Sequence, residues 1–392
     1  MRRRYHLHLP FLVYCGLTVL VAVAAINGGS NLLFWVFGAM ASALLVSGLL
    51  SGVMLLGLSV RRLLPAHGVV GEPMSVRYAI RNRSRLLPAF NLHCREHASP
   101  GESGWQDRIR GGLAWIMHIG PRELVHAEAI FWPTARGVVD FDDVEVRTSF
   151  PFGILGKSIV VTRPHGTLVF PPVLPLRQRV LDAIVPAADV GMKITQHPGA
   201  GDDYYGIREL RPGDSLRHIA WKRTANRDQL LCVERTRPNP PKLRVMLNLS
   251  RAPAEDGDAA AATRRRREEL AIILAASIVE AADASGLEVG LSVLGLATAP
   301  IPPRRSHWHR NKIMAALAEI DLDQPRLPAL RSPAVEMERI GVAVVHPGRA
   351  DLAVAREDAW HFTTTQMHHL VDRTEAELAT LVTPAAAAEA AS

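Results

Sequence analysis

The stretches LRVMLNL (243–249), LAIILAASIVEAA (270–282) and LEVGLSV (287–293) decide the fold of the second half of this chain. The outer two are short and aliphatic, which predicts buried strands. The middle stretch is apolar on nearly every side, which predicts a helix covered by other elements. Gly286 follows it at a position where helices commonly end. Strand, covered helix and strand in this order predict a parallel α/β sheet.

Weaker patterns extend this α/β domain over residues 241–383. Helices are expected at 312–320 and 369–382, and a further strand at 340–345. The alanine-rich tail at 384–392 is expected to be disordered.

The first sixty residues are set apart by their lack of charge. No charged residue occurs in the stretches 9–26 and 32–60, which a turn-forming run at 27–31 separates. The first stretch is roughly 27 Å long as a helix, close to the thickness of a hydrocarbon core. Basic residues flank the pair at 2–4 and 61–62, which favours a cytoplasmic location for both outer ends.

A cleaved signal peptide is the alternative, because small residues at 22–25 follow the first apolar run. It would leave the second stretch as an anchor and place the bulk of the protein outside the cell. Arg61 and Arg62 argue against that orientation. We therefore expect a transmembrane hairpin over residues 1–62, inserted in a lipid bilayer, with soluble domains in the cytoplasm.

Residues 63–172 show short alternating apolar runs interrupted by Gly, Pro and Asn, which predicts an all-β, sandwich-like domain. One such run consists of Met74, Val76, Tyr78 and Ile80. Four arginines lie in or just after it, namely Arg77, Arg81, Arg83 and Arg85. They suit either anionic lipid or a solvated strand face. A proline-rich stretch at 171–175 marks the start of a linker.

The overall composition restricts the classes of function. The chain has 392 residues, of which 48% are hydrophobic and 21% charged, so it can form large cores. Its net charge of +7 suits an anionic membrane surface or nucleic acid. The three cysteines are far apart, which indicates neither a disulfide framework nor a thiolate zinc site.

Residues 173–240 form the expected linker and contain the most unusual segment, GAGDDYYGIRELRPGDSLRHIAWKRTANRDQLLCVERTR at 199–237. Its charges alternate in sign, which favours ion pairs with bidentate arginine geometry. Ile219 and Trp221 are expected as buried anchors of a short helix. The segment either folds onto its own domain or faces a partner. The candidate residues are Arg208, Glu209, Pro212, Gly213, Asp214, Arg217, Ile219, Trp221 and Lys222.

The run RELRPGDSLRHIAWKRTA at 208–225 resembles the hallmark of a bacterial family, domain of unknown function 58. Arg136-Gly137 and Pro151-Phe152-Gly153 resemble its weaker signatures. The chain departs from the family pattern at Leu210, Ala220 and Asn226. The resemblance implies two inner-membrane spans, a β-rich middle and a doubly wound C-terminal domain similar to the von Willebrand factor A domain. It also implies a MoxR-type AAA+ ATPase as partner.

The resemblance also bears on metal binding. Metal-binding A domains carry Asp-x-Ser-x-Ser after their first strand, where this chain has Asn248, Ser250 and Ala252. Because Mg²⁺ prefers charged oxygen ligands, a site without its carboxylate should bind the ion poorly. We therefore expect neither a metal ion nor a cofactor.

Three functions are weighed on this basis. The leading hypothesis is a membrane-anchored, non-enzymatic interaction scaffold that works with the ATPase in assembly or maturation of protein complexes. The second is a hydrolase that uses groups in the 202–218 segment, namely Asp202, Asp203, Glu209, Asp214 and His218. The third is nucleic-acid binding. No catalytic or nucleic-acid-binding motif accompanies either alternative, so we expect no nucleic-acid partner.

Overall fold

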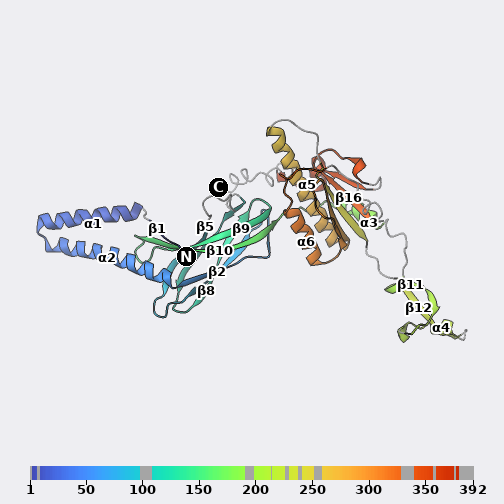
Figure 1. The fold of residues 1–392 in the computed structure, drawn as a ribbon, viewed down its shortest axis with the longest axis horizontal. Coiled ribbons are helices and arrows are strands. Elements are labelled where there is room, and N and C mark those ends of the chain that lie inside the picture. The colour runs from blue at the N-terminus through green and yellow to red at the C-terminus, as the bar shows by residue number, and fades with distance from the viewer. Residues whose placement is uncertain are drawn as a thin grey trace. The chain divides into compact units, whose positions relative to one another are not determined.

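A computed structural model describes most of the chain. The described residues are 2–6, 9–97, 108–189, 198–212, 214–225, 229–236, 241–250, 258–327, 340–355, 359–374 and 377–378. They fall into two compact units, which are treated separately below (Figure 1). The N-terminal unit consists mainly of Met1–Pro172, and the C-terminal unit mainly of Val173–Leu317 and Asp321–Ala387.

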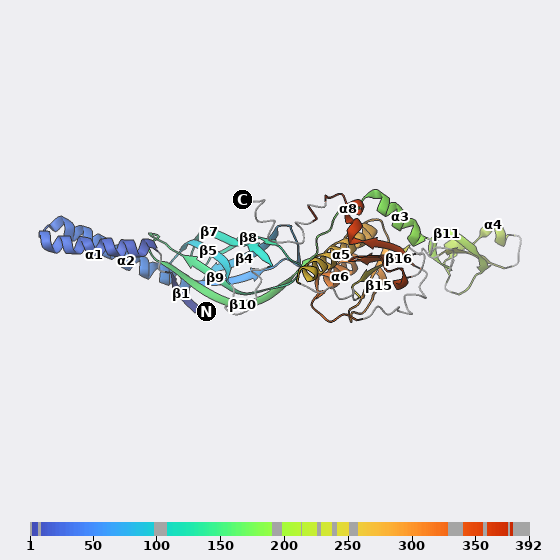
Figure 2. The same cartoon turned by 90° about the horizontal axis from the view of Figure 1, so that it is seen from above.

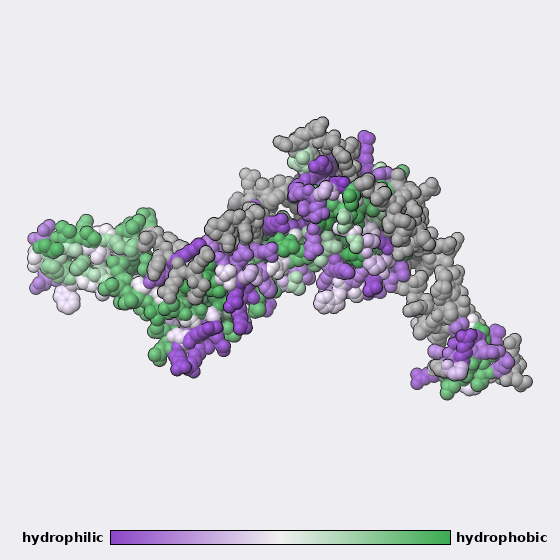
Figure 3. Space-filling view, viewed as in Figure 1, coloured by the Kyte–Doolittle hydropathy of each residue, from purple (hydrophilic) through white to green (hydrophobic). Residues whose placement is uncertain are grey.

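Two apolar helices begin the N-terminal unit, α1 (Leu9–Gly28) and α2 (Asn31–Leu56). They lie side by side in both ribbon views and contact each other along their length (Figures 1 and 2). At 1.5 Å per residue they are about 30 and 39 Å long, and both are apolar enough to cross a membrane. Most of their surface is apolar and unburied, as the space-filling view shows (Figure 3).

The second helix is shorter than predicted, because residues 58–63 form strand β2 (Leu58–Leu63). Leu58 and Val60 are buried in the core of the β-sheets, so their apolar character serves that core and not a membrane span. The side chain of Arg62 is also buried, where it pairs with Glu96. The expectation of a transmembrane hairpin reaching residue 62, flanked by Arg62, was therefore wrong at this end.

A short strand precedes the first helix. Strand β1 (Arg2–His6) pairs antiparallel with β10 (Gly156–Phe170), with Arg2 opposite Val160 and His6 opposite Gly156. The start of α1 and the end of α2 therefore join the same group of sheets, and both outer ends of the helical hairpin lie on one side. Cleavage between the two helices, as a signal peptide would require, would remove an edge strand of this sheet.

Two antiparallel-rich sheets form the rest of the N-terminal unit. The first has the order β1-β10-β9-β5-β7, with β3 also paired to β10, and the second has the order β2-β4-β8-β6. The other strands of the first sheet are β3 (His67–Val69), β5 (Ala89–His97), β7 (Leu113–Ile119) and β9 (Gly137–Thr148). The other strands of the second sheet are β4 (Met74–Asn82), β6 (Ile109–Gly111) and β8 (Leu124–Pro133).

The alternation predicted for β4 is confirmed. Its residues Met74, Val76, Tyr78 and Ile80 are buried in a core cluster that both sheets share. The intervening Arg77 and Arg81 are exposed, as the pleat of a half-buried strand requires.

The C-terminal unit has a five-stranded sheet of order β15-β14-β13-β16-β17. The first strand, β13 (Lys242–Asn248), is parallel to β14 (Glu288–Leu294) on one side and to β16 (Gly341–His346) on the other. Strand β17 (Trp360–Thr363) is parallel to β16, whereas β15 (Ile301–Arg304) is antiparallel to β14. Helix α5 (Asp258–Ala284) links β13 to β14 and contacts both, so the predicted strand, helix and strand are confirmed.

Other elements of this unit differ from their predicted bounds. The linker region contains helix α3 (Gln178–Asp189), whose Val180 and Ile184 are buried. Helix α6 (His307–Ala318) begins earlier than predicted. Among the described residues of this unit, 3-10 helices are formed by η3 (Leu216–His218), η4 (Leu352–Val354) and η5 (Thr364–Gln366).

The last predicted helix, at 369–382, is confirmed only in part, because residues 369–370 and 377–378 are helical but residues 371–374 are not. Helix α8 (Met367–Leu370) ends just before Val371, which is extended and forms a β-bridge with Leu176. That bridge uses the backbone that a continuing helix would need. Residues 379–382 and the predicted tail at 384–392 lie outside the described residues.

Candidate functional site

The unusual charged segment folds as a β-hairpin with an elaborate connection. Strand β11 (Pro198–Glu209) pairs antiparallel with β12 (Leu231–Thr236), with Arg208 opposite Cys232. Between them the chain forms η3 and the short helix α4 (Trp221–Thr224). We call residues 206–236 the charged hairpin.

The segment between the two strands folds back and pairs with the edge of β12 that does not face β11. Ile219 forms a β-bridge with Cys232, and the Ala220 amide donates a hydrogen bond to the Leu231 carbonyl at 2.8 Å. The Leu231 amide in turn donates to Thr224 Oγ1 at 3.2 Å. Strand β12 is thus held from both sides, and Ile219, Leu231 and Cys232 form a small buried core.

Trp221 does not belong to this core. Ile219 is buried as predicted, but Trp221 is 65% exposed, so the prediction of a buried anchor was wrong there. Helix α4 has only four residues. It is held to β12 through Thr224 and the backbone, and not through the indole of Trp221. The indole of Trp221 is therefore available at the surface of a braced element.

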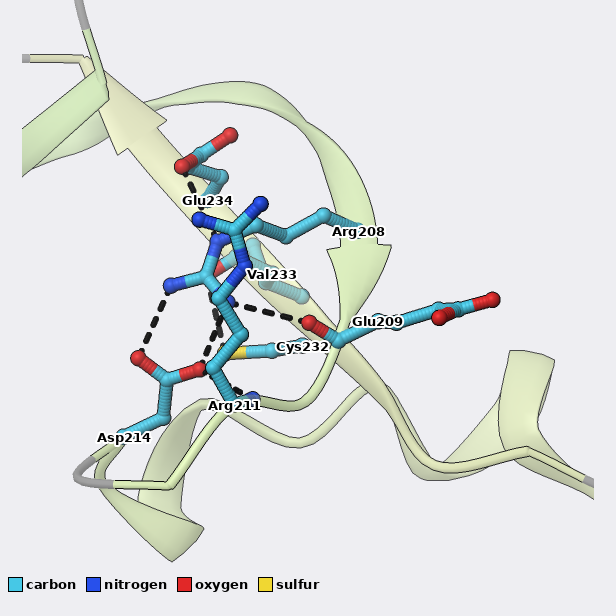
Figure 4. A network of polar contacts seen from close by, with 7 residues as sticks. All are labelled: Arg208, Glu209, Arg211, Asp214, Cys232, Val233 and Glu234. Carbon is cyan, nitrogen blue, oxygen red and sulfur yellow. Dashed lines mark hydrogen bonds and ion pairs between the residues drawn. The ribbon is translucent and has the colours of Figure 1, made fainter.

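Arg208 is the centre of a polar network inside the charged hairpin (Figure 4). Its Nη1 and Nη2 donate to the two carboxylate oxygens of Asp214 at 2.6 and 2.8 Å. Its Nε donates to Glu234 Oε1 at 3.1 Å, and Nη1 also donates to the Glu209 carbonyl at 3.0 Å. Asp214 accepts a further hydrogen bond from the Arg211 amide at 2.8 Å. One arginine therefore fixes the turn between Glu209 and Asp214 to strand β12.

These contacts set the charge state of the network. The hydrogen bonds from Arg208, and then that from the Arg211 amide, lower the pKa of Asp214 to about 2. The two carboxylates also raise the pKa of Arg208 above its ordinary value. Asp214 is therefore a permanently ionised acceptor at neutral pH, which suits bracing and not proton transfer.

The acidic residues weighed for hydrolysis are not gathered around one point among the described side chains. Asp214 is occupied by Arg208, and the carboxylate of Glu209 is directed away from the network (Figure 4). His218 is exposed. The side chains of Asp202 and Asp203 lie outside those described.

The other candidate residues are turned toward solvent. Arg217, Trp221 and Lys222 are exposed, as are Leu216 and Pro212. The Ser215 side chain accepts a hydrogen bond from the Arg217 amide and caps η3, which fixes the backbone around Arg217. Gly213 lies outside the described residues. The charged hairpin thus has two parts. Arg208, Asp214 and Glu234 form an internal brace. Arg217, Trp221 and Lys222 are exposed.

Asn248 and Ser250 lie at the end of β13, where they are held by neighbouring groups. Asn248 Oδ1 accepts hydrogen bonds from the amide and the hydroxyl of Ser250, so its Nδ2 donates to Nδ1 of His346, at 3.2 Å. His346 Nε2 lies 2.9 Å from His361 Nδ1. Ala252 lies outside the described residues.

This histidine pair was missed in the sequence, where His346 and His361 are fifteen positions apart. One feature of the sequence could have indicated the pair. His346 ends an aliphatic strand, and His361 lies within a strand that contains aromatic residues. Burial, together with the neighbouring His361, lowers the pKa of His346 to about 4. Within the described part of the chain, no three His, Cys, Asp or Glu side chains are grouped so that they could hold a metal ion.

Comparison with known proteins gives one informative match. Residues 206–371 match the family described as "Protein of unknown function DUF58". No curated protein matches the chain.

The solved structures that match the chain include two of an enzyme from Vibrio harveyi. A GH20 exo β-N-acetylglucosaminidase from Vibrio harveyi, in complex with N-acetylglucosamine, has 10% identity and a TM-score of 0.16. The match covers 80% of this chain and 60% of the other. An inactive mutant of the Vibrio harveyi enzyme has 9% identity and a TM-score of 0.15, with coverages of 80% and 59%. Similarity this low bears on neither fold nor function.

Proposed function

We propose that this chain, which belongs to the DUF58 family through residues 206–371, is a membrane-anchored, non-enzymatic interaction scaffold. Its partner is a MoxR-type AAA+ ATPase, and the two act together in chaperone-like assembly or maturation of other protein complexes. The anchor is the α1–α2 hairpin in the bacterial inner membrane, and both soluble units are cytoplasmic.

The observation that carries the proposal is the exposure of Trp221 on a hairpin that is internally braced. Tryptophan and arginine are the residues that most often dominate binding energy at protein interfaces. Arg208 and Asp214 hold the connection, so Arg217 and Trp221 are presented on a backbone that is already ordered. Pre-ordering reduces the entropy lost on binding.

The exposed residues also indicate the chemistry of the partner surface. Basic side chains surround Trp221 in the sequence, namely Arg217, His218, Lys222 and Arg223, and all are exposed. A complementary surface would have an apolar pocket for the indole and acidic residues around it. Opposite charges of this kind mainly increase the association rate and select against wrong partners.

The membrane anchor contributes through effective concentration. A domain tethered to the bilayer encounters other membrane-bound or membrane-recruited proteins at higher local concentration than a free domain would. A modest contact through the charged hairpin would then suffice for regulated recruitment.

We further propose that the C-terminal unit is a von Willebrand factor A-like, doubly wound domain. The support is that the chain leaves β13 toward β14 on one side and later returns to β16 on the other side. Asn248 is hydrogen-bonded to Ser250 and to His346 where such domains carry metal ligands. The domain would therefore serve in protein binding without a metal ion.

The proposal is tested by partner capture from native membranes. The full chain with Arg217→Ala and Trp221→Ala is expected to recover at least about tenfold less ATPase after crosslinking than the wild type, since hot-spot losses reach 2 kcal/mol or more. The matched control is Arg305→Ala with Trp308→Ala, an exposed arginine and an exposed tryptophan elsewhere in the C-terminal unit. It should capture the ATPase as the wild type does.

Two outcomes would contradict the proposal. Equal recovery by the Arg217 and Trp221 variant and by the control would exclude the charged hairpin as the contact. Recovery of no AAA+ ATPase by the wild type itself would exclude the partnership.

A further inference from the structure

Several loops of the N-terminal unit gather at the end where the two apolar helices join it. The Arg83 amide donates to the carbonyl of Gly57, the residue after α2, at 2.7 Å. The Arg122 amide donates to the Ser84 carbonyl at 3.0 Å. The β9–β10 loop lies at the same end, because Gly156 is opposite His6, just before α1. We call loops 83–88, 120–123 and 149–155 the helix-side tip.

The last turns of α2 pack against this end of the sheets. The buried residues of α2 are Ser47, Ser51, Met54 and Leu55, all in its second half. The ammonium group of Lys157 donates to the Gly48 carbonyl, and a Cβ placed on Gly48 would lie 3.8 Å from Leu155 Cδ2. A lysine at this level of the helix is costly inside hydrocarbon.

These contacts locate the membrane boundary, given the anchoring proposed above, on which this inference rests. If hydrocarbon ends near Gly48, residues 31–47 of α2 span about 26 Å and α1 about 30 Å, and both match the core of a bilayer. Loop 149–155, which is next to Gly48, then lies at the level of the lipid headgroups. Loop 83–88 is joined at Gly57, about 14 Å further along the axis of α2, and reaches the headgroups when the hairpin tilts toward that loop.

Large apolar side chains project from the helix-side tip. Leu86 is 85% exposed and Phe152 is 57% exposed, and Leu87 and Leu124 are exposed beside them. Their loops are ordered by local contacts. Ser84 Oγ accepts from the Leu87 amide at 2.9 Å, and Phe150 stacks on Phe90 with ring centroids 4.7 Å apart. Exposed apolar groups on ordered loops indicate a surface that is covered in the cell.

The charges around these residues are mainly positive. Arg83, Arg85 and Arg122 are exposed in the same loops. The one carboxylate of these loops, Glu123, accepts a hydrogen bond from the Gly120 amide. Apolar side chains flanked by arginines match the interface of a bilayer that contains anionic lipids.

We propose that the helix-side tip docks on the bilayer, with Leu86 and Phe152 inserted at the acyl–headgroup boundary and Arg83, Arg85 and Arg122 bound to anionic headgroups. The occupant is lipid, because the tip lies at the end of the sheets where the chain enters α1 and leaves α2. Docking would fix the orientation of the β-sheets relative to the membrane, which a hairpin alone would leave variable.

Spin labels on the reconstituted full chain test this proposal. Cys15 and Cys232 are replaced by Ala, and labels are placed with Leu86→Cys, Phe152→Cys, Leu20→Cys in the first span and Glu72→Cys at the opposite end of the sheets. Vesicles contain phosphatidylcholine with or without phosphatidylglycerol. Accessibility to oxygen, which partitions into lipid, is compared with accessibility to a water-soluble nickel chelate.

Positions 86 and 152 are expected to favour oxygen, as position 20 does, whereas position 72 favours the nickel chelate. If positions 86 and 152 favour the nickel chelate, as position 72 does, while position 20 favours oxygen, docking of the tip is overturned but anchoring by the helices stands. If position 20 also contacts water, the anchoring is wrong. Shielding of 86 and 152 from both reagents would mean a protein cover and would overturn the lipid assignment.

The headgroup contacts are tested separately. In wild-type background, phosphatidylglycerol should increase the oxygen preference at positions 86 and 152. The triple change Arg83→Gln, Arg85→Gln and Arg122→Gln should abolish that increase. An increase of the same size in the triple variant, or no effect of phosphatidylglycerol at all, would overturn the role of the arginines.

Discussion

The guanidinium of Arg62 and the carboxylate of Glu96 face each other in the interior of the N-terminal unit, with side-chain exposures of 1% and 0%. Arg62 Nε donates to Glu96 Oε1 at 2.8 Å, and the Tyr78 hydroxyl donates to the same oxygen at 2.7 Å. Arg62 Nη1 also donates to the carbonyls of Phe141 and Arg163. The pair ties β2, which follows the second apolar helix, to both sheets.

Removing one partner should destabilise the N-terminal unit strongly. Glu96→Ala leaves the Arg62 charge buried without a counter-charge, which typically costs about 3 to 5 kcal/mol. Amide hydrogen exchange in β4 should accelerate by roughly a hundredfold or more, as measured by mass spectrometry. Arg61→Ala, at the exposed neighbouring position, is the control. Equal exchange in the two variants would mean that the pair contributes nothing to stability.

Loss of the Asp214 carboxylate should loosen the charged hairpin. In Asp214→Asn the amide cannot pair with both Arg208 nitrogens, so the turn is released and the buried Cys232 thiol should react faster with a maleimide. Glu209→Gln, whose carboxylate lies outside the network, should react at the wild-type rate. Partner capture should fall in Asp214→Asn although Trp221 is intact. Unchanged Cys232 reactivity in Asp214→Asn would refute the bracing role.

The stability of the C-terminal unit should decrease as the pH falls from 6.5 to about 4. The unfolded histidine takes up a proton near pH 6.5, whereas His346 in the fold does so only near pH 4. The unfolded state therefore binds more protons in this window, and stability falls by up to about 1.4 kcal/mol per pH unit. Urea unfolding between these pH values measures the slope. His346→Leu should flatten it, whereas His369→Leu, at an exposed position, should leave it unchanged.

The pairing of β1 with β10 puts both outer ends of the helical hairpin on one side, and the proposed cytoplasmic location then puts the α1–α2 turn outside. Ser30→Cys, in the turn between α1 and α2, should react with a membrane-impermeant maleimide added to the outside of spheroplasts. Glu72→Cys should react only in inverted vesicles. Labelling of both cysteines from one side would contradict a hairpin that crosses the membrane twice.

The sequence was most informative where apolar spacing repeats. The buried faces of β4 and β13 follow from alternation or continuity of aliphatic residues, because this pattern is contained within one short stretch of sequence. Strand β1 could not be predicted in this way. It has five residues, and its partner strand begins about 150 residues later.

The errors at the site have related causes. Arg62 resembled a membrane-flanking charge because its partner, Glu96, is 34 positions away. Trp221 was expected inside because large aromatic residues usually are buried, whereas a four-residue helix has no face that can cover one. Arg208 and Asp214 are only six positions apart, and the density of alternating charge predicted bidentate arginine pairs in this segment without identifying which residues form them. Local ion pairs are thus easier to foresee than long-range ones.

Strand β1 leaves the ribosome long before β10 exists. At 5 to 20 residues per second, translation of the intervening chain takes on the order of 10 to 30 s, and under the proposed anchoring the apolar hairpin enters the bilayer in this time. The first sheet can close only if both ends of that hairpin remain on the compartment side where β10 is made. A copy in which only one of the two helices crossed would hold β1 and β10 on opposite sides and leave the edge of β10 unpaired, so completion of the sheet acts as a check that both helices cross.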